Sequence, residues 1–127
     1  MTMLEKARAL REDTSVHYNC CQAVLMAAAP KLGLSEEQAA ALGAHFGSGM
    51  RHGATCGALT GALMAAGLAG KDGAAASQLI SKFRITNGCT DCAGLLTAAK
   101  QRGEEKKAHC DRLVYESVEA LEELLAL

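Results

Sequence analysis

The chain has 127 residues, which is the size of a single domain with its own hydrophobic core. Half of the residues are hydrophobic, but only 3% are aromatic and tryptophan is absent, so small side chains have to form the core. The formal net charge of −1 lacks the basic excess typical of nucleic-acid binding. A single proline and an alanine-rich composition also exclude a disordered chain or an all-β sandwich.

Helical signals run through nearly the whole chain, and no segment alternates with period two for long enough to predict a strand. Asn19, Ser35 and Asp72 are typical N-caps, and Gly33 marks the end of a helix. We expect helices over residues 2–12, 19–31, 35–46, 55–68, 72–86, 90–100 and 105–126. The sequence therefore predicts one all-α domain over residues 1–127, a compact bundle of six or seven short helices with a glycine-rich inter-helix loop.

The start of the chain has neither the basic residues nor the apolar run of a secretory signal. The longest apolar run, 56–69, is shorter than the roughly 20 residues of a membrane span and contains glycine and threonine. We therefore expect a cytoplasmic protein with no membrane segment. Thiols are kept reduced in the cytosol, so six cysteines are more typical of redox chemistry or metal binding than of structural disulfides.

Four cysteines are predicted to face the core from four different helices. Cys20, Cys56 and Cys92 fall in the first turns of predicted helices, where unpaired N–H groups and the helix dipole stabilise a thiolate. Each begins the apolar stripe of its helix, and Cys110 lies on the stripe of the last helix. The four could therefore converge on one buried point. The alternative for any single cysteine is a small hydrophobic residue in the core.

Local spacing alone identifies no known site. Cys89 and Cys92 form a CxxC, but the βαβ pattern of a thioredoxin-like chain is missing. A structural zinc site usually has two close ligand pairs, and the adjacent Cys20 and Cys21 do not supply the second. Any site must therefore be assembled by the tertiary structure.

The cysteine-bearing segments resemble those of the C_GCAxxG_C_C family, a family named for its cysteines and regarded as redox-active. The first motif is carried by Asn19-Cys20-Cys21-Gln22-Ala23-Val24-Leu25. The central glycine-rich motif is carried by Phe46-Gly47-Ser48-Gly49-Met50 and by Cys56-Gly57-Ala58-Leu59-Thr60-Gly61-Ala62-Leu63-Met64. Cys92 with Leu95-Leu96 and Cys110 with Leu113-Val114 resemble the third and fourth cysteine positions.

This resemblance covers roughly residues 15–122 and selects Cys20, Cys56, Cys92 and Cys110 as the functional set. A related module occurs in split-Soret-type cytochromes together with an iron–sulfur centre. The resemblance thus implies that the four cysteines ligate an iron–sulfur cluster for electron transfer or redox sensing.

Three other functions stay open. A metal-free thiol/disulfide redox protein is favoured by the CxxC and by the vicinal pair, in which the extra thiols Cys21 or Cys89 would act as resolving residues. A thiol-dependent enzyme would need one nucleophilic cysteine. A non-catalytic interaction module would use the alanine- and glycine-rich helices to pack into a homodimer, with the cysteines as core or as a structural metal clamp. A redox protein would also need a partner protein, which the sequence does not identify.

The glycine-rich loop 47–53 is a second candidate site. Gly47 and Gly49 allow backbone N–H groups to approach a ligand closely, and Arg51 and His52 add positive charge for an anionic one. We therefore predict Gly47, Gly49 and His52 as cofactor-binding residues, with a tightly packed helix connection as the alternative. The other histidines are expected at the surface or at helix ends: His17, His45 and His109. On a helix His109 should point away from any site that contains Cys110.

Overall fold

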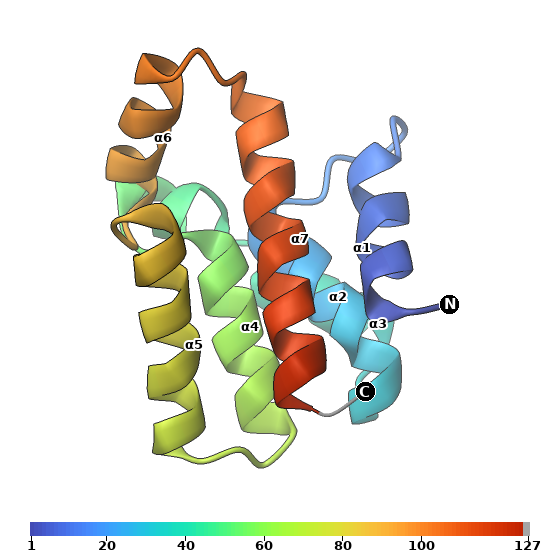
Figure 1. Ribbon diagram of the computed structural model, residues 1–127. Helices are drawn as coiled ribbons and strands as arrows, with labels where there is room; N and C mark the ends of the chain where they lie inside the picture. Colours follow the sequence, from blue (N-terminus) through green and yellow to red (C-terminus); the bar gives the residue numbers. More distant parts are fainter. Residues whose placement is uncertain (126–127) are drawn as a thin grey trace.

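Seven α-helices and one short irregular turn account for most of residues 1–125, the part of the chain that the computed structural model describes (Figure 1). They are α1 (Met3–Glu12), α2 (Cys20–Leu32), α3 (Glu36–Gly43), η1 (Gly49–Gly53), α4 (Gly57–Leu68), α5 (Gly73–Asn87), α6 (Cys92–Gln101) and α7 (Lys106–Leu124). The predicted all-α fold is confirmed. The expected end of the last helix, at residue 126, lies outside the described residues.

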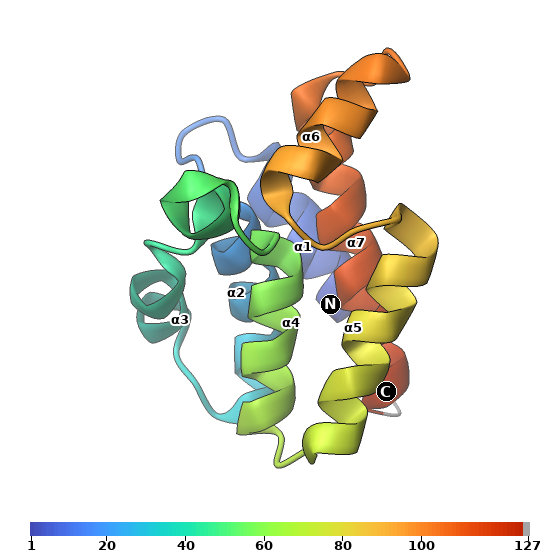
Figure 2. The ribbon, with the colours of Figure 1, turned by 90° about the vertical axis from the view of Figure 1, so that its left-hand side faces the viewer.

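The helices are arranged around α2 and α4, which lie side by side and make the most extensive contact in the bundle. Helix α7 packs across both of them, α1 packs against α2 and α7, and α3 packs mainly against α2. Helix α5 lies beside α4, and α6 stands at one end of the bundle next to η1 and the start of α7 (Figures 1 and 2). The first residues of α2, α4 and α6 therefore lie towards the same end of the molecule.

Local capping explains most helix starts. Asn19 and Ser35 form capping boxes with Gln22 and Gln38, and the Asp72 side chain accepts from the backbone of Ala75. Helices α2 and α5 end at glycines with a left-handed conformation.

Three predicted boundaries were wrong. Helix α3 ends at Gly43, three residues before its predicted end. Helix α4 starts at Gly57 with Cys56 at the N-cap position, and Asp91 rather than Thr90 caps α6. These two starts shift because residues 54–56 and 90–92 pair with each other through their backbones.

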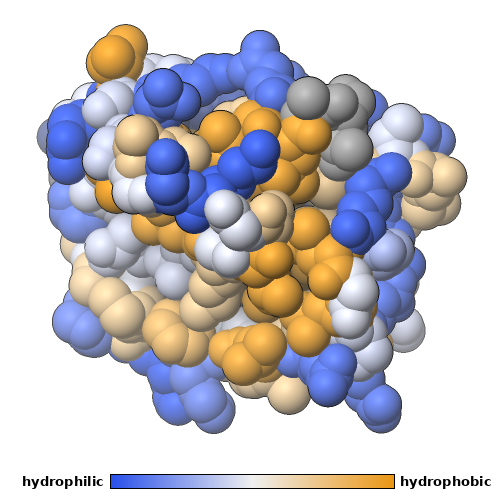
Figure 3. All heavy atoms as spheres, turned by 90° about the horizontal axis from the view of Figure 1, so that it is seen from below, coloured by the Kyte–Doolittle hydropathy of each residue, from blue (hydrophilic) through white to orange (hydrophobic). Residues whose placement is uncertain are grey.

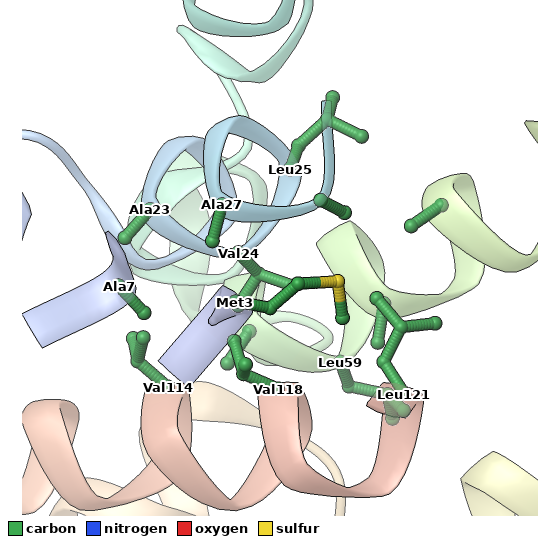
Figure 4. Close-up of a cluster of buried hydrophobic side chains, with 14 of the residues drawn as sticks. Met3, Ala7, Ala23, Val24, Leu25, Ala27, Leu59, Val114, Val118 and Leu121 are labelled. Carbon is green, nitrogen blue, oxygen red and sulfur yellow. The ribbon is translucent and has the colours of Figure 1, made fainter. Parts of the chain in front are cut away.

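The core is built from small side chains, as the composition predicts. Figure 4 shows Met3 of α1 lying among Val24, Leu59 and Val118, which come from α2, α4 and α7. Eight alanines of α2 and α4 are at most 3% exposed, and they allow the helices to approach closely: Ala23, Ala27, Ala28, Ala29, Ala58, Ala62, Ala65 and Ala66. At the end of the bundle opposite α6, hydrophobic side chains gather in the middle of the surface and hydrophilic ones surround them (Figure 3).

Two glycines of α4 set the distance between α4 and α2. A Cβ atom on Gly61 would lie 2.9 Å from the carbonyl oxygen of Cys21 and 3.1 Å from Cβ of Val24. A Cβ atom on Gly57 would lie 2.8 Å from the carbonyl oxygen of Phe46. Backbone therefore contacts backbone at the starts of both helices, and any larger residue would push them apart.

In residues 1–125, no helix combines the length and the apolar composition needed to cross a lipid bilayer.

The substitution Gly61→Ala should destabilise the protein, because its Cβ has no space against the backbone of α2. We expect the free energy of unfolding to fall by about 1–2 kcal/mol in chemical denaturation, since overpacking outweighs the gain in helix propensity. Gly67→Ala in the same helix is the matched control. A Cβ atom on Gly67 would have no neighbouring atom within 4 Å, so this substitution should leave stability unchanged or raise it. Equal effects of the two substitutions would contradict this account of the α2–α4 contact.

Candidate functional site

Four of the six cysteines line one cavity of about 300 Å³ at the end of the bundle where α2, α4 and α6 begin. They are the four that the sequence selected: Cys20, Cys56, Cys92 and Cys110. Cys20 and Cys92 are the first residues of α2 and α6, Cys56 is the N-cap of α4, and Cys110 lies in the second turn of α7. Tertiary structure thus brings cysteines from four helices to one cavity.

A short backbone pairing joins the segment that carries Cys56 to the segment that carries Cys92. The N–H of Cys56 donates to the carbonyl of Thr90 at 2.8 Å, and the N–H of Cys92 donates to the carbonyl of Ala54 at 2.6 Å. Together they form an isolated antiparallel bridge centred on Thr55 and Asp91. Sequence periodicity could not reveal this contact, because a one-residue bridge has no alternating pattern.

The side chains of Cys20 and Cys110 each shift the pKa of the other. The Cys20 thiol, together with the positive charges of Arg11 and Lys106, lowers the pKa of Cys110 to about 7 against the opposing effect of burial. The interaction with Cys110 and burial raise the pKa of Cys20 well above its ordinary value. Cys110 is therefore the thiol of the two that ionises more readily, and Cys20 keeps its proton to higher pH.

The other two thiols stay protonated near neutral pH. Burial raises the pKa of Cys56 to about 11, although the nearby backbone N–H groups of Ala58 and Leu59 oppose that shift. Burial and the neighbouring Cys110 also raise the pKa of Cys92. The expectation that helix N-termini favour thiolates at Cys20, Cys56 and Cys92 was wrong for the free thiols, because burial and thiol neighbours outweigh the local backbone donors.

Basic side chains line the same cavity. Arg11 is only 8% exposed; its Nε donates to Asp111 at 2.6 Å, and another guanidinium nitrogen donates to the carbonyl of Tyr18 at 2.8 Å. Lys107 donates to the second oxygen of Asp111 at 2.9 Å. Lys106 also lines the cavity. These cations make the cavity suitable for a negatively charged group.

The two remaining cysteines lie outside the cavity. Cys21 is fully buried with its Sγ 4.0 Å from Sδ of Met64, and burial raises its pKa to about 12. Cys89 lies next to Gly94 on the other side of the α6 start, and partial burial with the nearby Asp91 raises its pKa. The CxxC is thus divided, with Cys92 in the cavity and Cys89 outside it.

The glycine-rich loop touches the cavity through Ser48, whereas Gly47, Gly49 and His52 are not among the residues that line it. A Cβ on Gly47 would lie 2.5 Å from Cβ of Asn19, so the loop packs tightly against the start of α2. Ser48, Gly49 and the next two residues all have a left-handed conformation, with φ between 53° and 68°. His52 is exposed. Ligand binding by these three residues stays a prediction.

His109 lies in the first turn of α7, at a helix end as expected, but it is buried and not at the surface. It is 1% exposed, with its Nδ1 3.3 Å from a carboxylate oxygen of Glu104 and 3.2 Å from a guanidinium nitrogen of Arg112. The turn before α7 covers it. The charged residues of this turn predict a solvent-exposed segment, so the sequence pattern did not indicate that the turn buries His109. His109 also lines the cysteine cavity beside Cys110, so the expected separation of these two residues was wrong.

In residues 1–125, no group of three or more histidine, cysteine, aspartate or glutamate side chains is arranged to hold one metal ion. The four cysteines therefore share a cavity without meeting around a single ligand position. Cys110 is the thiol that shifts the pKa of each of the other three.

A comparison with protein families matches residues 18–124 to the family described as "Putative redox-active protein (C_GCAxxG_C_C)". Neither the curated proteins nor the solved structures contain a significant match to the chain.

The lowered pKa of Cys110 predicts a reactivity profile for the reduced, metal-free protein. Alkylation of Cys110 by iodoacetamide should rise with a midpoint near pH 7, because only the thiolate reacts and it accumulates above that pH. Cys21 should react slowly at every pH up to 10. Peptide mass spectrometry measures both rates.

The control is Cys20→Ala, which removes the neighbouring thiol that stabilises the Cys110 thiolate. Its midpoint should move upward towards that of an ordinary cysteine. A wild-type midpoint close to pH 9 would contradict the proposed pairing.

Proposed function

We propose that this chain, which belongs to the C_GCAxxG_C_C family, uses Cys20, Cys56, Cys92 and Cys110 as thiolate ligands of an iron–sulfur cluster for electron transfer or redox sensing. The observation that supports this proposal is that four cysteines from four helices line one cavity of about 300 Å³. Packing explains a single buried cysteine, but it does not explain four that surround a space.

The donor set fits such a cluster. Iron–sulfur clusters take four cysteine thiolates, and because these bind different iron atoms, the sulfurs need not surround one ion. Arg11 and Lys106 supply positive charge next to the site, which offsets the charge of several thiolates. When bound, the cluster would supply reversible one-electron chemistry.

Several residues of the chain would control the environment of the four sulfurs. The backbone N–H groups of Ala58 and Leu59 act to lower the pKa of Cys56, and N–H groups near a ligand sulfur adjust the reduction potential of a ligated cluster. Leu95 and Leu113 form apolar walls of the cavity and limit the access of water.

Anaerobic reconstitution with iron and sulfide tests this proposal. The wild-type protein should become brown and bind iron and acid-labile sulfide. Cys56→Ser and Cys92→Ser should each lose most of the visible absorption, because each removes one of four ligands.

Cys21→Ser and Cys89→Ser are the matched controls, since these cysteines lie outside the cavity, and they should keep the wild-type spectrum and iron content. The proposal fails if the wild type takes up no iron, or if removal of Cys21 abolishes the spectrum while removal of Cys56 does not.

The Cys20–Cys110 pair favours a second candidate function, thiol/disulfide exchange. The Cys110 thiolate would attack a substrate disulfide and release one thiolate, which takes up a proton. The Cys20 thiol would then lose its proton and attack the mixed disulfide, so that one disulfide is reduced to two thiols while Cys20 and Cys110 become a disulfide. This reaction needs only two of the four cysteines.

Oxidation of the metal-free protein with diamide distinguishes the two candidates. Exchange chemistry predicts a single intramolecular disulfide between Cys20 and Cys110, which peptide mapping detects, and Cys56→Ser should form it as readily as the wild type. If oxidation instead joins Cys20 to Cys21 or Cys89 to Cys92, the second candidate is excluded.

A further inference from the structure

A second cavity, larger than the cysteine site at about 470 Å³, lies where α4, α5 and α7 meet. Figure 2 shows α4, α5 and α7 side by side around this region. None of its lining residues is a cysteine or belongs to the glycine-rich loop. Its volume falls in the range of small-molecule sites, so it requires an explanation separate from the redox site.

One side of this cavity is apolar and fixed by the core. Leu59 and Ala62 project from α4, and Leu79 and Phe83 project from α5. All four are less than 8% exposed, so they cannot move away without disturbing the bundle. These side chains form a preformed wall for a flat or ring-shaped apolar body.

Ser117 of α7 provides a polar group at the same cavity. It is 5% exposed, and its hydroxyl is the one buried side-chain nitrogen or oxygen in residues 1–125 without a hydrogen-bond partner. Buried hydroxyls normally have a partner, and Ser117 is one of the residues that line the cavity. A polar atom of a bound molecule would satisfy it.

The rim is strongly acidic. Lys82 is the basic residue among the lining residues. Four glutamates of α7 also line the cavity: Glu116, Glu119, Glu122 and Glu123. Lys82 is paired with Glu123, and Glu116 is bonded to Arg112. In residues 1–125, Glu119 and Glu122 take part in no ion pair. Their charges therefore favour a cation at the mouth and oppose an anion.

We propose that this cavity binds a small amphiphilic cation, with an aromatic or alicyclic body against Leu59, Leu79 and Phe83 and a protonated amine near Glu119 and Glu122. The Ser117 hydroxyl supplies a hydrogen bond to a polar atom of the same molecule. This site is separate from the cysteine cavity and does not depend on cluster chemistry.

Three probes of similar size and different charge test the proposal: 2-phenylethylamine, 2-phenylethanol and 3-phenylpropionate. Each is titrated into ¹⁵N-labelled protein at pH 7 and followed by NMR. The amine should bind saturably, with amide shifts centred on Leu79, Phe83 and Ser117. Its dissociation constant should be about three- to tenfold lower than that of the carboxylate, with the alcohol between them, and added salt should reduce the difference.

Charge-neutralising variants then locate the interaction. The double variant Glu119→Gln/Glu122→Gln should weaken amine binding towards that of the alcohol, without changing binding of the alcohol itself. Glu37→Gln on the exposed surface of α3 is the matched control and should have no effect. Ser117→Ala should weaken binding of the alcohol as well as the amine. Both glutamates lie at the rim, so the double variant should remain folded.

The proposal is overturned if the three probes bind with equal affinity, if no probe saturates, or if the shifts centre on the cysteine cavity. Reconstitution with iron and sulfide provides an independent measurement, because the glutamate variants should form the same amount of cluster as the wild type. A loss of amine selectivity with unchanged cluster formation would show that the two sites are separate.

Discussion

The whole arrangement depends on the close contact between the starts of α2 and α4. Gly57 and Gly61 bring the backbone of α4 against the backbone of α2, and no side chain larger than hydrogen fits between them. Cys20 and Cys56 begin these two helices, so the same contact sets the separation of their thiols. The short pairing of residues 54–56 with 90–92 then adds Cys92, and the packing of α7 across α2 and α4 adds Cys110. The site is therefore a consequence of backbone geometry rather than of local cysteine spacing.

Burial and neighbouring charge have opposite effects on these thiols. The backbone N–H groups of Ala58 and Leu59 act to lower the pKa of Cys56, yet burial still raises it to about 11. Cys110 lies in the second turn of a helix and has the lowest pKa of the four, because Cys20, Arg11 and Lys106 surround it. A group that binds all four sulfurs must therefore displace protons from at least three of them, and its binding would strengthen as pH rises. A reaction that uses only Cys20 and Cys110 starts from a thiolate that already exists near pH 7.

The sequence predicted the helices and the four cavity cysteines because both depend on regular patterns. Capping residues such as Asn19, Ser35 and Asp72 act locally, and the apolar stripes place Cys20, Cys56, Cys92 and Cys110 on core-facing positions. The pairing of residues 54–56 with residues 90–92 through a single bridge, and the burial of His109 under the turn that carries Glu104, could not be predicted. The bridge depends on a contact between segments that lie far apart in the chain. The burial of His109 depends on a turn whose charged composition indicates a solvent-exposed segment.

Helices α4 and α7 each contribute lining residues to both cavities. The spacing of these residues along each helix explains how one helix reaches two cavities. Cys110 and Ser117 are seven residues apart on α7, which puts them on the same face about 10 Å apart along the helix. Cys56 and Leu59 lie about one helical turn apart at the start of α4, with one residue at each cavity. The core between these positions is closely packed, with Val114 and Val118 fully buried. One rigid pair of helices thus shapes a basic, sulfur-lined cavity at one end and an acidic, apolar one further along. Because the charges around the two cavities are opposite, a ligand whose charge suits one of them is repelled by the other.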